Sequence, residues 1–221
     1  RLRSAADSNA LLERCFRDGL FLTVADSSRA DGAWFTWHQV FVRHVRQVAA
    51  RRDPDAVREH HHRAAQWWRA IDPAAAVRHA LEAGRPGLAA EYASDAWPDL
   101  VLAGHATTVV ELVRDLPGDL PQEAELRLAL AFVEAERGDD ARARHELALA
   151  DGAARRLGDG DRVRFEARSA ALSLLYLVSS PAALKVVVDR GRDLIRRIEA
   201  DPSAADPTTL ALTRLCVGMG E

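Results

Sequence analysis

Apolar residues recur three and four positions apart along most of this 221-residue chain, with polar residues between them. This spacing predicts amphipathic helices that bury one face. Breaks such as IDP, AGRPG and LPGDLP separate the helical stretches, and their Gly, Pro and Asp residues end one helix or start the next. Beyond residue 54 the pattern predicts helices only, over residues 55–71, 74–83, 86–103, 105–115, 121–137, 139–157, 160–179, 181–200 and 206–217.

Three of the breaks resemble one another: HALEAGRPGLAAEYA, LVLAGHATTVVELV and FVEAERGDDARARHELALA. In each, an apolar helix end is followed by Gly, a short polar link and a further helix. Helix pairs that cannot bury their apolar faces alone stack on their neighbours. We therefore expect a tetratricopeptide-like α-solenoid of antiparallel helix pairs, with degenerate periods, over residues 54–221. The stretch from Glu123 to Gly138 is apolar nearly all round, which predicts a helix sandwiched between neighbours.

The first 53 residues follow a different pattern. SNALLERCFRDG predicts a helix that ends at Gly19, and LFLTV and AWFTW predict two strands joined by the turn SSRADG. A helix from His38 to about Arg52 follows, and Phe41, Val45 and Val48 predict that it has one buried face. Helix, strand, turn, strand and helix is the order of a small winged-helix unit, which we assign to residues 1–53. The predicted fold class is mainly α, with this unit followed by the solenoid.

RRDPD at residues 51–55 marks the boundary between the two predicted domains. Proline disfavours a helical residue before it and suits the first turn of a new helix. The chain begins at Arg1 rather than at a methionine. We expect a piece of a longer protein, truncated within the winged-helix unit and continuing beyond residue 221.

The composition, 48% hydrophobic and 29% charged, is that of a folded globular protein. The net charge of -3 argues against a generally basic nucleic-acid surface. Cys15 and Cys216 match no zinc or disulfide spacing. With no signal-peptide pattern and no apolar run of membrane length, we expect a cytoplasmic protein without membrane contact.

No catalytic set of residues emerges. Lys185, the only lysine, follows Leu184, so a Gly-Lys-Ser/Thr phosphate loop is absent, and so is a Gly-x-Ser-x-Gly elbow. We expect no enzyme activity within this chain. The HHH run at residues 60–62 does not predict a metal site, because consecutive side chains on a helix diverge by about 100 degrees.

Two groups of side chains are candidates for binding. Trp67 and Trp68 are candidate ligand or partner contacts, since aromatic faces stack on apolar rings, while core packing is the other interpretation. A basic group on the helix that starts at His38 could contact DNA phosphates, but neighbouring acidic residues offset its charge, so we expect no direct DNA contact. The basic residues are Arg43, Arg46, Arg51 and Arg52.

Taken in order, NALLERCFRDGLFLTVAD, WFTWHQVFVRHVRQ and HHHRAAQWWRAIDPAAAVRHALEAGRPGLAAEYA resemble the middle of the MalT-like regulators. These are large bacterial signal-transduction ATPases of the STAND class, and many carry a LuxR-type output domain. The resemblance covers residues 8 to about 93. It implies a winged-helix region and the start of a helical sensor, preceded by an ATPase module that uses ATP and ADP. Neither the ATPase nor the output motifs lie in these residues, so no cofactor is expected here.

The resemblance also implies a role for His38. In related STAND proteins a winged-helix histidine in a Met-His-Asp motif contacts the β-phosphate of bound ADP, and His38 falls at the matching place. Gln39 replaces the Asp of that motif, and Val40 replaces the usual Leu of the MalT-like motif. An imidazole N–H donates readily to a phosphate oxygen. A buried histidine at the helix start, satisfied by the backbone, stays open as the other interpretation.

The implied function is that of a regulatory segment that couples inducer or partner binding on the helical array to the nucleotide state of the ATPase module. Its partners would be that module, a small-molecule inducer or regulatory protein, and a second copy on activation. A protein–protein scaffold and a DNA-binding winged helix are the alternatives. The residues leave open the inducer, the target genes, the oligomeric state and whether the output is a promoter or another effector such as a kinase.

Overall fold

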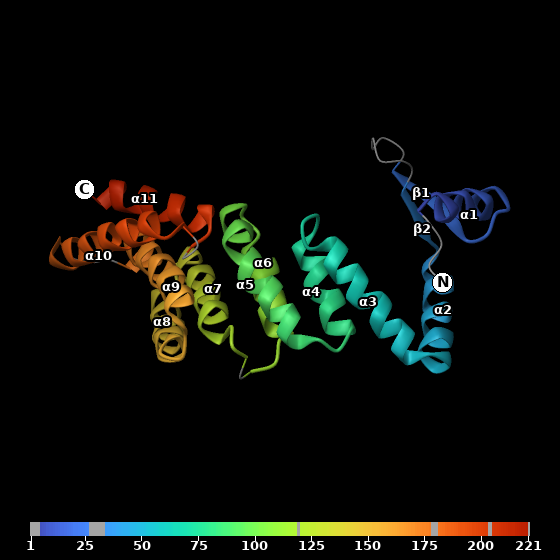
Figure 1. Cartoon of the computed structure of the whole chain (residues 1–221), viewed down its shortest axis with the longest axis horizontal. Coiled ribbons are helices and arrows are strands. Elements are labelled where there is room, and N and C mark those ends of the chain that lie inside the picture. Colours follow the sequence, from blue (N-terminus) through green and yellow to red (C-terminus); the bar gives the residue numbers. More distant parts are fainter. Residues whose placement is uncertain (1–4, 27–33, 119, 178–180, 203–204, 221) are drawn as a thin grey trace. The chain divides into compact units, whose positions relative to one another are not determined.

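The computed structural model describes residues 5–26, 34–118, 120–177, 181–202 and 205–220, and these are mainly helical (Figure 1). The chain divides into two compact units, Arg1–Arg58 (unit 1) and Glu59–Glu221 (unit 2). Helix α3 (Pro54–Trp68) begins in unit 1 and ends in unit 2. The boundary predicted at residues 53 and 54 falls where α3 begins.

Unit 1 contains α1 (Ala5–Arg17), β1 (Leu22–Asp26), β2 (Trp34–Trp37) and α2 (Gln39–Arg52). The two strands are antiparallel, with Leu22 opposite Trp37 and Val24 opposite Phe35, and an irregularity follows Val24. This is the helix, strand, strand and helix order predicted from the sequence. The predicted turn SSRADG, residues 27–32, lies outside the described residues.

The helices of unit 2 follow the predicted ranges to within a few residues. They are α4 (Pro73–Glu82), α5 (Pro86–Leu102), α6 (Ala106–Arg114), α7 (Glu123–Glu136), α8 (Asp140–Ala154), α9 (Asp159–Leu172), α10 (Pro181–Ala200) and α11 (Pro207–Gly220). A π-helical turn, η1 (Ser173–Leu177), continues α9. The sequence pattern did not distinguish this turn from an ordinary helix end.

The three similar sequence breaks form the same structure, a helix C-cap closed by glycine. Gly84, Gly104 and Gly138 have φ values of 70, 77 and 80 degrees, a region that costs glycine little and other residues more. The next backbone N–H reaches back to the last turn of the helix at each break: Arg85 to Ala80 O at 3.0 Å, His105 to Leu100 O at 2.8 Å and Asp139 to Glu134 O at 2.9 Å. These bonds satisfy carbonyl groups that a helix end leaves unpaired.

Helix α7 lies at the centre of unit 2, as its sequence predicted. It packs against α5, α6, α8 and α9, and Leu126, Leu128, Phe132 and Val133 are buried. Leu128 and Phe132 belong to the largest core cluster, together with Trp97 and Phe165, whereas Leu126 belongs to a second cluster formed mainly by α4 and α5. Helix α7 therefore joins the two clusters.

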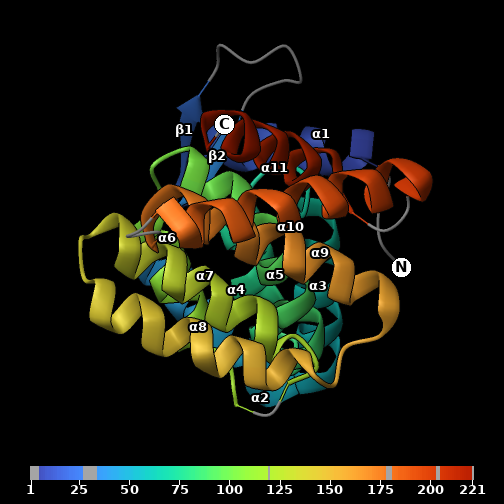
Figure 2. The same cartoon turned by 90° about the vertical axis from the view of Figure 1, so that its left-hand side faces the viewer.

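The last two helices pack side by side, and α11 also contacts α9 and α5 (Figure 2). Gly191 of α10 makes close packing possible, because a Cβ at that position would lie only 2.5 Å from Cγ2 of Val217 in α11. Helix α11 therefore packs on α10 and α9, and its contact with α5 connects it to the first half of unit 2.

Candidate functional site

His38 is the N-cap residue of α2 and follows β2 directly. Its backbone N–H donates to the carbonyl oxygen of Phe21 at 2.7 Å, and its side chain is exposed and makes no cap hydrogen bond. The interpretation of His38 as a buried histidine is therefore wrong for this structure, because the short hairpin covers the backbone of the helix start and leaves the imidazole outside. The nucleotide-sensing role of His38 stays a prediction.

An exposed aromatic group lies next to this helix start. Phe21 has a φ of 46 degrees, which is unusual for a residue with a bulky side chain, and its side chain is 60% exposed. The ring stacks on that of Phe41, with 5.4 Å between centroids and 8 degrees between planes. The β1–β2 hairpin thus holds His38 at a solvent-facing, partly aromatic edge of unit 1.

The face of α2 that was predicted to be buried is exposed over most of its length. Phe41 is half-buried, whereas Val45 and Val48 are 44% and 47% exposed, and no residue of α2 is fully buried. The hairpin contacts the first turn of α2, and the described residues of unit 1 leave the rest of the apolar stripe exposed. The basic residues predicted for this helix, Arg43, Arg46, Arg51 and Arg52, are also exposed.

Trp67 and Trp68 lie together at the end of α3 in unit 2. Their ring centroids are 4.5 Å apart, in an edge-to-face arrangement. Trp67 is 53% exposed, while Trp68 is half-buried against the second core cluster. Trp68 thus packs partly against the core, whereas about half of the Trp67 side chain is exposed, and a role in ligand or partner contact stays a prediction.

The three histidines of the HHH run point to different surroundings on α3. His60 is exposed, His61 Nδ1 lies 2.9 Å from Nδ1 of His79, and His62 Nε2 lies 3.2 Å from Nε2 of Gln66. Within the described part of the chain, no group of three or more His, Cys, Asp or Glu residues could hold a metal ion. No helix of the described residues is long and apolar enough to cross a membrane.

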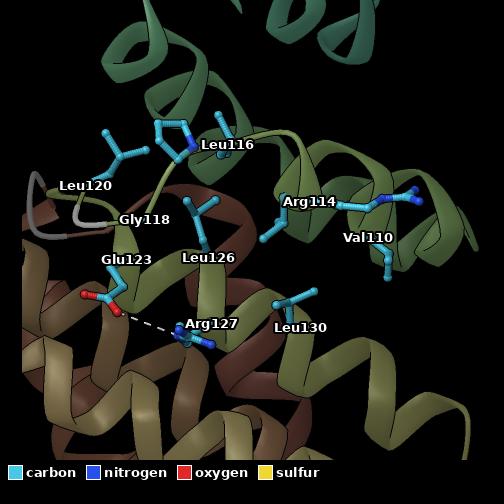
Figure 3. A pocket seen from close by; sticks show the side chains of 11 residues that line it. Val110, Arg114, Leu116, Gly118, Leu120, Glu123, Leu126, Arg127 and Leu130 are labelled. Atoms are coloured by element: carbon cyan, nitrogen blue, oxygen red, sulfur yellow. Dashed lines mark ion pairs between the residues drawn. The ribbon is translucent and has the colours of Figure 1, made fainter.

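A cavity of about 380 Å³ opens between α6, the connection that follows it, and α7 (Figure 3). We call it the α6–α7 cavity. Figure 3 shows α6 and the connection above it, α7 below it, and Leu126 pointing up between them. Apolar side chains form most of its lining: Val110, Val113, Leu116, Pro117, Leu120, Leu126 and Leu130.

Charged side chains at the α7 side of the cavity form a chain of ion pairs. Arg127 lies 3.7 Å from Glu123 and 3.1 Å from Glu146 of α8, and Glu123 also accepts a hydrogen bond of 2.6 Å from Arg156. Two positive and two negative groups thus offset one another. Arg114 lies at the α6 edge of the cavity and is exposed.

Another charged cluster lies inside unit 2, around Arg168 of α9. The Arg168 guanidinium donates to Glu125 at 2.8 Å, to Asp206 at 2.7 Å and to Thr209 at 2.8 Å, and it lies over the ring of Trp97. Arg168 is 3% and Glu125 is 4% exposed. We call these residues the Arg168 clamp, since they connect α5, α7, α9 and the start of α11.

The surroundings of the clamp change the titration of one member. Burial works to raise the pKa of Asp206, but hydrogen bonds from Thr209 and the charge of Arg168 outweigh it and hold that pKa below its usual value. The hydrogen bonds of the clamp join α9 to α7 and to the start of α11. We interpret it as a structural element.

The α6–α7 cavity was not predicted from the sequence. LPGDLP at residues 116–121 was interpreted only as a helix break. Two prolines within six residues remove backbone donors and fix the backbone, so residues 115–118 and 120–122 form no helix, and space remains between α6 and α7. The two leucines within this break, Leu116 and Leu120, line the cavity, and they are the signal that could have indicated it.

Among the known proteins that are similar to this chain are a protein kinase and a transcriptional regulator. The chain is 31% identical to the serine/threonine-protein kinase PknK of Mycobacterium tuberculosis over 133 residues. This matched stretch makes up 59% of this chain and 12% of the kinase. The chain is 37% identical over 89 residues to the HTH-type transcriptional regulator MalT of Yersinia enterocolitica, covering 40% of this chain and 10% of the regulator. The chain thus spans about a tenth of the length of these relatives. No protein-family profile and no solved structure matches it.

Proposed function

We propose that this chain is a signal-sensing and signal-transducing segment of a larger bacterial regulator of the MalT-like STAND type. One observation carries the proposal: the chain resembles about a tenth of each of two proteins whose names describe different outputs, transcriptional regulation and protein phosphorylation. A segment similar to parts of both belongs more naturally to sensing or transmission than to either output. Its role is therefore regulatory, and the output lies elsewhere in the protein.

In this proposal unit 2 receives the signal. A small-molecule inducer or a regulatory protein binds its helices, and the exposed ring of Trp67 and the α6–α7 cavity are the surfaces that support such contacts. A ligand that binds one conformation better than another shifts the equilibrium between them. The shift opens the protein, permits ATP exchange in an upstream ATPase module and allows self-association in the cytoplasm. The segment itself is proposed to catalyse no reaction.

Unit 1 is proposed to report the nucleotide state. The exposed imidazole of His38, at the start of α2, donates a hydrogen bond to a phosphate of ADP held by the ATPase module. The backbone bond from His38 to Phe21 supports this role because it fixes the position of the helix start. ATP and ADP are cofactors of that module and not of this segment.

Direct contact with DNA is not part of the proposal. Four exposed arginines lie on α2, but the same helix exposes Val40, Val45 and Val48, which suit a protein surface better than a phosphate backbone. The chain also has a net charge of -3. Salt dependence distinguishes the two cases, since DNA binding through phosphates weakens steeply with salt.

The test compares ADP binding by the full-length protein with that of two histidine variants. His38→Ala removes the proposed phosphate contact, and His44→Ala removes another exposed histidine of the same helix. A hydrogen bond to a charged group contributes about 1.5–3 kcal/mol, so His38→Ala is expected to weaken ADP binding about tenfold or more and to raise the basal output. His44→Ala should leave both unchanged.

Calorimetry measures the affinity, and circular dichroism verifies that each variant is folded. Unchanged ADP affinity in a folded His38→Ala protein would show that His38 does not contact nucleotide. Equal losses in both variants would point to a general disturbance of α2. Either result would remove the nucleotide-sensing part of the proposal.

A further inference from the structure

We propose that the α6–α7 cavity binds a neutral, mainly apolar small molecule that carries one or two hydrogen-bonding groups. The inference rests on the proposed sensing function, for which it names the site and the class of ligand. Neither the resemblance to regulators nor the candidate residues His38, Trp67 and Trp68 indicated this place in the fold.

The size and lining of the cavity favour a small apolar ligand. A volume of about 380 Å³ falls at the low end of the range of about 300–1,000 Å³ that is typical of small-molecule sites. Leucine, valine and proline side chains line it from three segments, α6, the connection and α7. A sugar or another densely hydroxylated ligand would place hydroxyl groups against these walls without partners, which costs free energy.

The charges at the cavity favour a neutral ligand. Arg127 is already paired with Glu123 and Glu146, and Glu123 is also paired with Arg156. Each of these groups already has an opposite charge beside it. A charged ligand would therefore have to break one of these ion pairs in order to form its own. A hydroxyl, amide or carbonyl group can instead add a hydrogen bond to Arg127 or Glu123 at the edge of the apolar walls. Arg114 is exposed, so its attraction for an anion is screened by solvent.

Helix α7 gives ligand binding a route to the rest of unit 2. Glu123, Leu126 and Leu130 line the cavity, while Glu125 of the same helix takes part in the Arg168 clamp. A ligand held between α6 and α7 contacts the helix that the clamp connects to α9 and α11. Binding to the folded form is therefore expected to raise the thermal stability of unit 2.

The test uses two fluorescent probes of nearly the same shape, neutral N-phenylnaphthylamine and its anionic counterpart anilinonaphthalenesulfonate. Both become brighter in apolar surroundings. We expect saturable binding of the neutral probe to one site on the 221-residue chain. We expect weaker binding of the sulfonate, because its negative charge would lie beside the ion pairs of Arg127 and Glu123, which already offset one another.

Two leucine variants locate the site. Leu130→Trp fills the cavity from α7, where Leu130 is half-buried, and leaves no space for the ring of the probe. Leu149→Trp adds the same side chain at an exposed position of α8. The first variant is expected to weaken binding of the neutral probe about tenfold or more, as the loss of an apolar pocket for a ring implies. The second should bind like the original chain, and circular dichroism verifies that both are folded.

Full binding by folded Leu130→Trp would overturn the site, and tighter binding of the sulfonate would overturn the neutral class of ligand. No saturable binding of the neutral probe would overturn the proposal outright, while the nucleotide test on His38 would stand. If the neutral probe binds at the cavity and leaves both ADP affinity and output of the full-length protein unchanged, the site is real and the sensing function fails.

Discussion

Replacing Arg168 by methionine tests whether the Arg168 clamp holds unit 2 together. The arginine side chain is 3% exposed and donates to Glu125, Asp206 and Thr209 at 2.7–2.8 Å. Its loss leaves the buried carboxylate of Glu125 without its closest positive partner. Removing one member of a buried ion pair costs about 3–5 kcal/mol.

The lower end of that range applies here. Trp97 Nε1 still donates to Glu125 at 3.2 Å, and Arg164 lies 3.7 Å away from it, so Glu125 retains some compensation. We expect Arg168→Met to lower the free energy of unfolding by about 3 kcal/mol. For a unit of this size the transition temperature should fall by about 6–12 °C.

Urea and thermal unfolding followed by far-UV circular dichroism measure both quantities. Arg196→Met is the control, because its side chain is 69% exposed and its bond to Asp193 lies at the surface of α10; its cost should stay below about 1 kcal/mol. In the double variant Arg168→Met with Glu125→Gln the carboxylate is neutral, so part of the loss should be recovered. A loss below about 1 kcal/mol for Arg168→Met would refute the structural role of the clamp.

Other features of unit 2 yield three further predictions. Gly191→Ala should destabilise the protein by about 1–3 kcal/mol in urea unfolding, because its Cβ would clash with α11. Gly152→Ala on α8, where a Cβ meets nothing within 4 Å, should stabilise it by up to about 1 kcal/mol; equal effects of the two would contradict the packing of α10 on α11. In the folded protein the pKa of Asp206 lies below its ordinary value of 3.8. The ionised Asp206 therefore contributes its full stabilisation above pH 3.8, and this contribution is lost as the pH falls through the lower pKa of the folded form. Asp206→Asn should therefore flatten the acid limb of a thermal-stability profile, and an unaltered limb would count against this. Burial raises the pKa of Cys216 to about 11. A thiol reagent at neutral pH should therefore label Cys15 first and Cys216 only in denaturant. Rapid labelling of Cys216 in the native protein would show that α11 does not stay packed on its neighbours.

The helices of unit 2 could be predicted closely because their signals are local. Glycine at residues 84, 104 and 138 ends a helix through the conformation of one residue, and proline at residues 73, 86, 181 and 207 opens one. The central place of α7 was also predictable, since a helix that is apolar on every side must be covered on every side. These inferences needed no knowledge of which helices meet.

Features that depend on distant contacts were missed or wrong. The face of α2 was predicted to be buried from its spacing alone, but spacing does not say what covers it, and Val45 and Val48 are exposed. Arg168 gave no signal among the other arginines of the chain, because its partners at residues 94, 125, 206 and 209 are remote in sequence. The α6–α7 cavity could not be predicted, because its shape depends on the path of the residues that connect α6 and α7. His38 was found only through a family resemblance, and the structure adds that its side chain is accessible.

The glycine C-caps have a consequence for the order in which the chain folds. Each cap is closed by bonds between residues only three to five apart, so a helix end can form as soon as its own residues leave the ribosome. The Arg168 clamp behaves in the opposite way, because it cannot close until Asp206 and Thr209 have been synthesised, 38 and 41 residues after Arg168. Helix docking should therefore proceed from the first pairs onward during synthesis, and the clamp should close only when α11 has been made. A chain arrested before residue 206 would hold its earlier helices but leave Arg168 without Asp206 and Thr209, and such a form would be a natural substrate of a chaperone or protease.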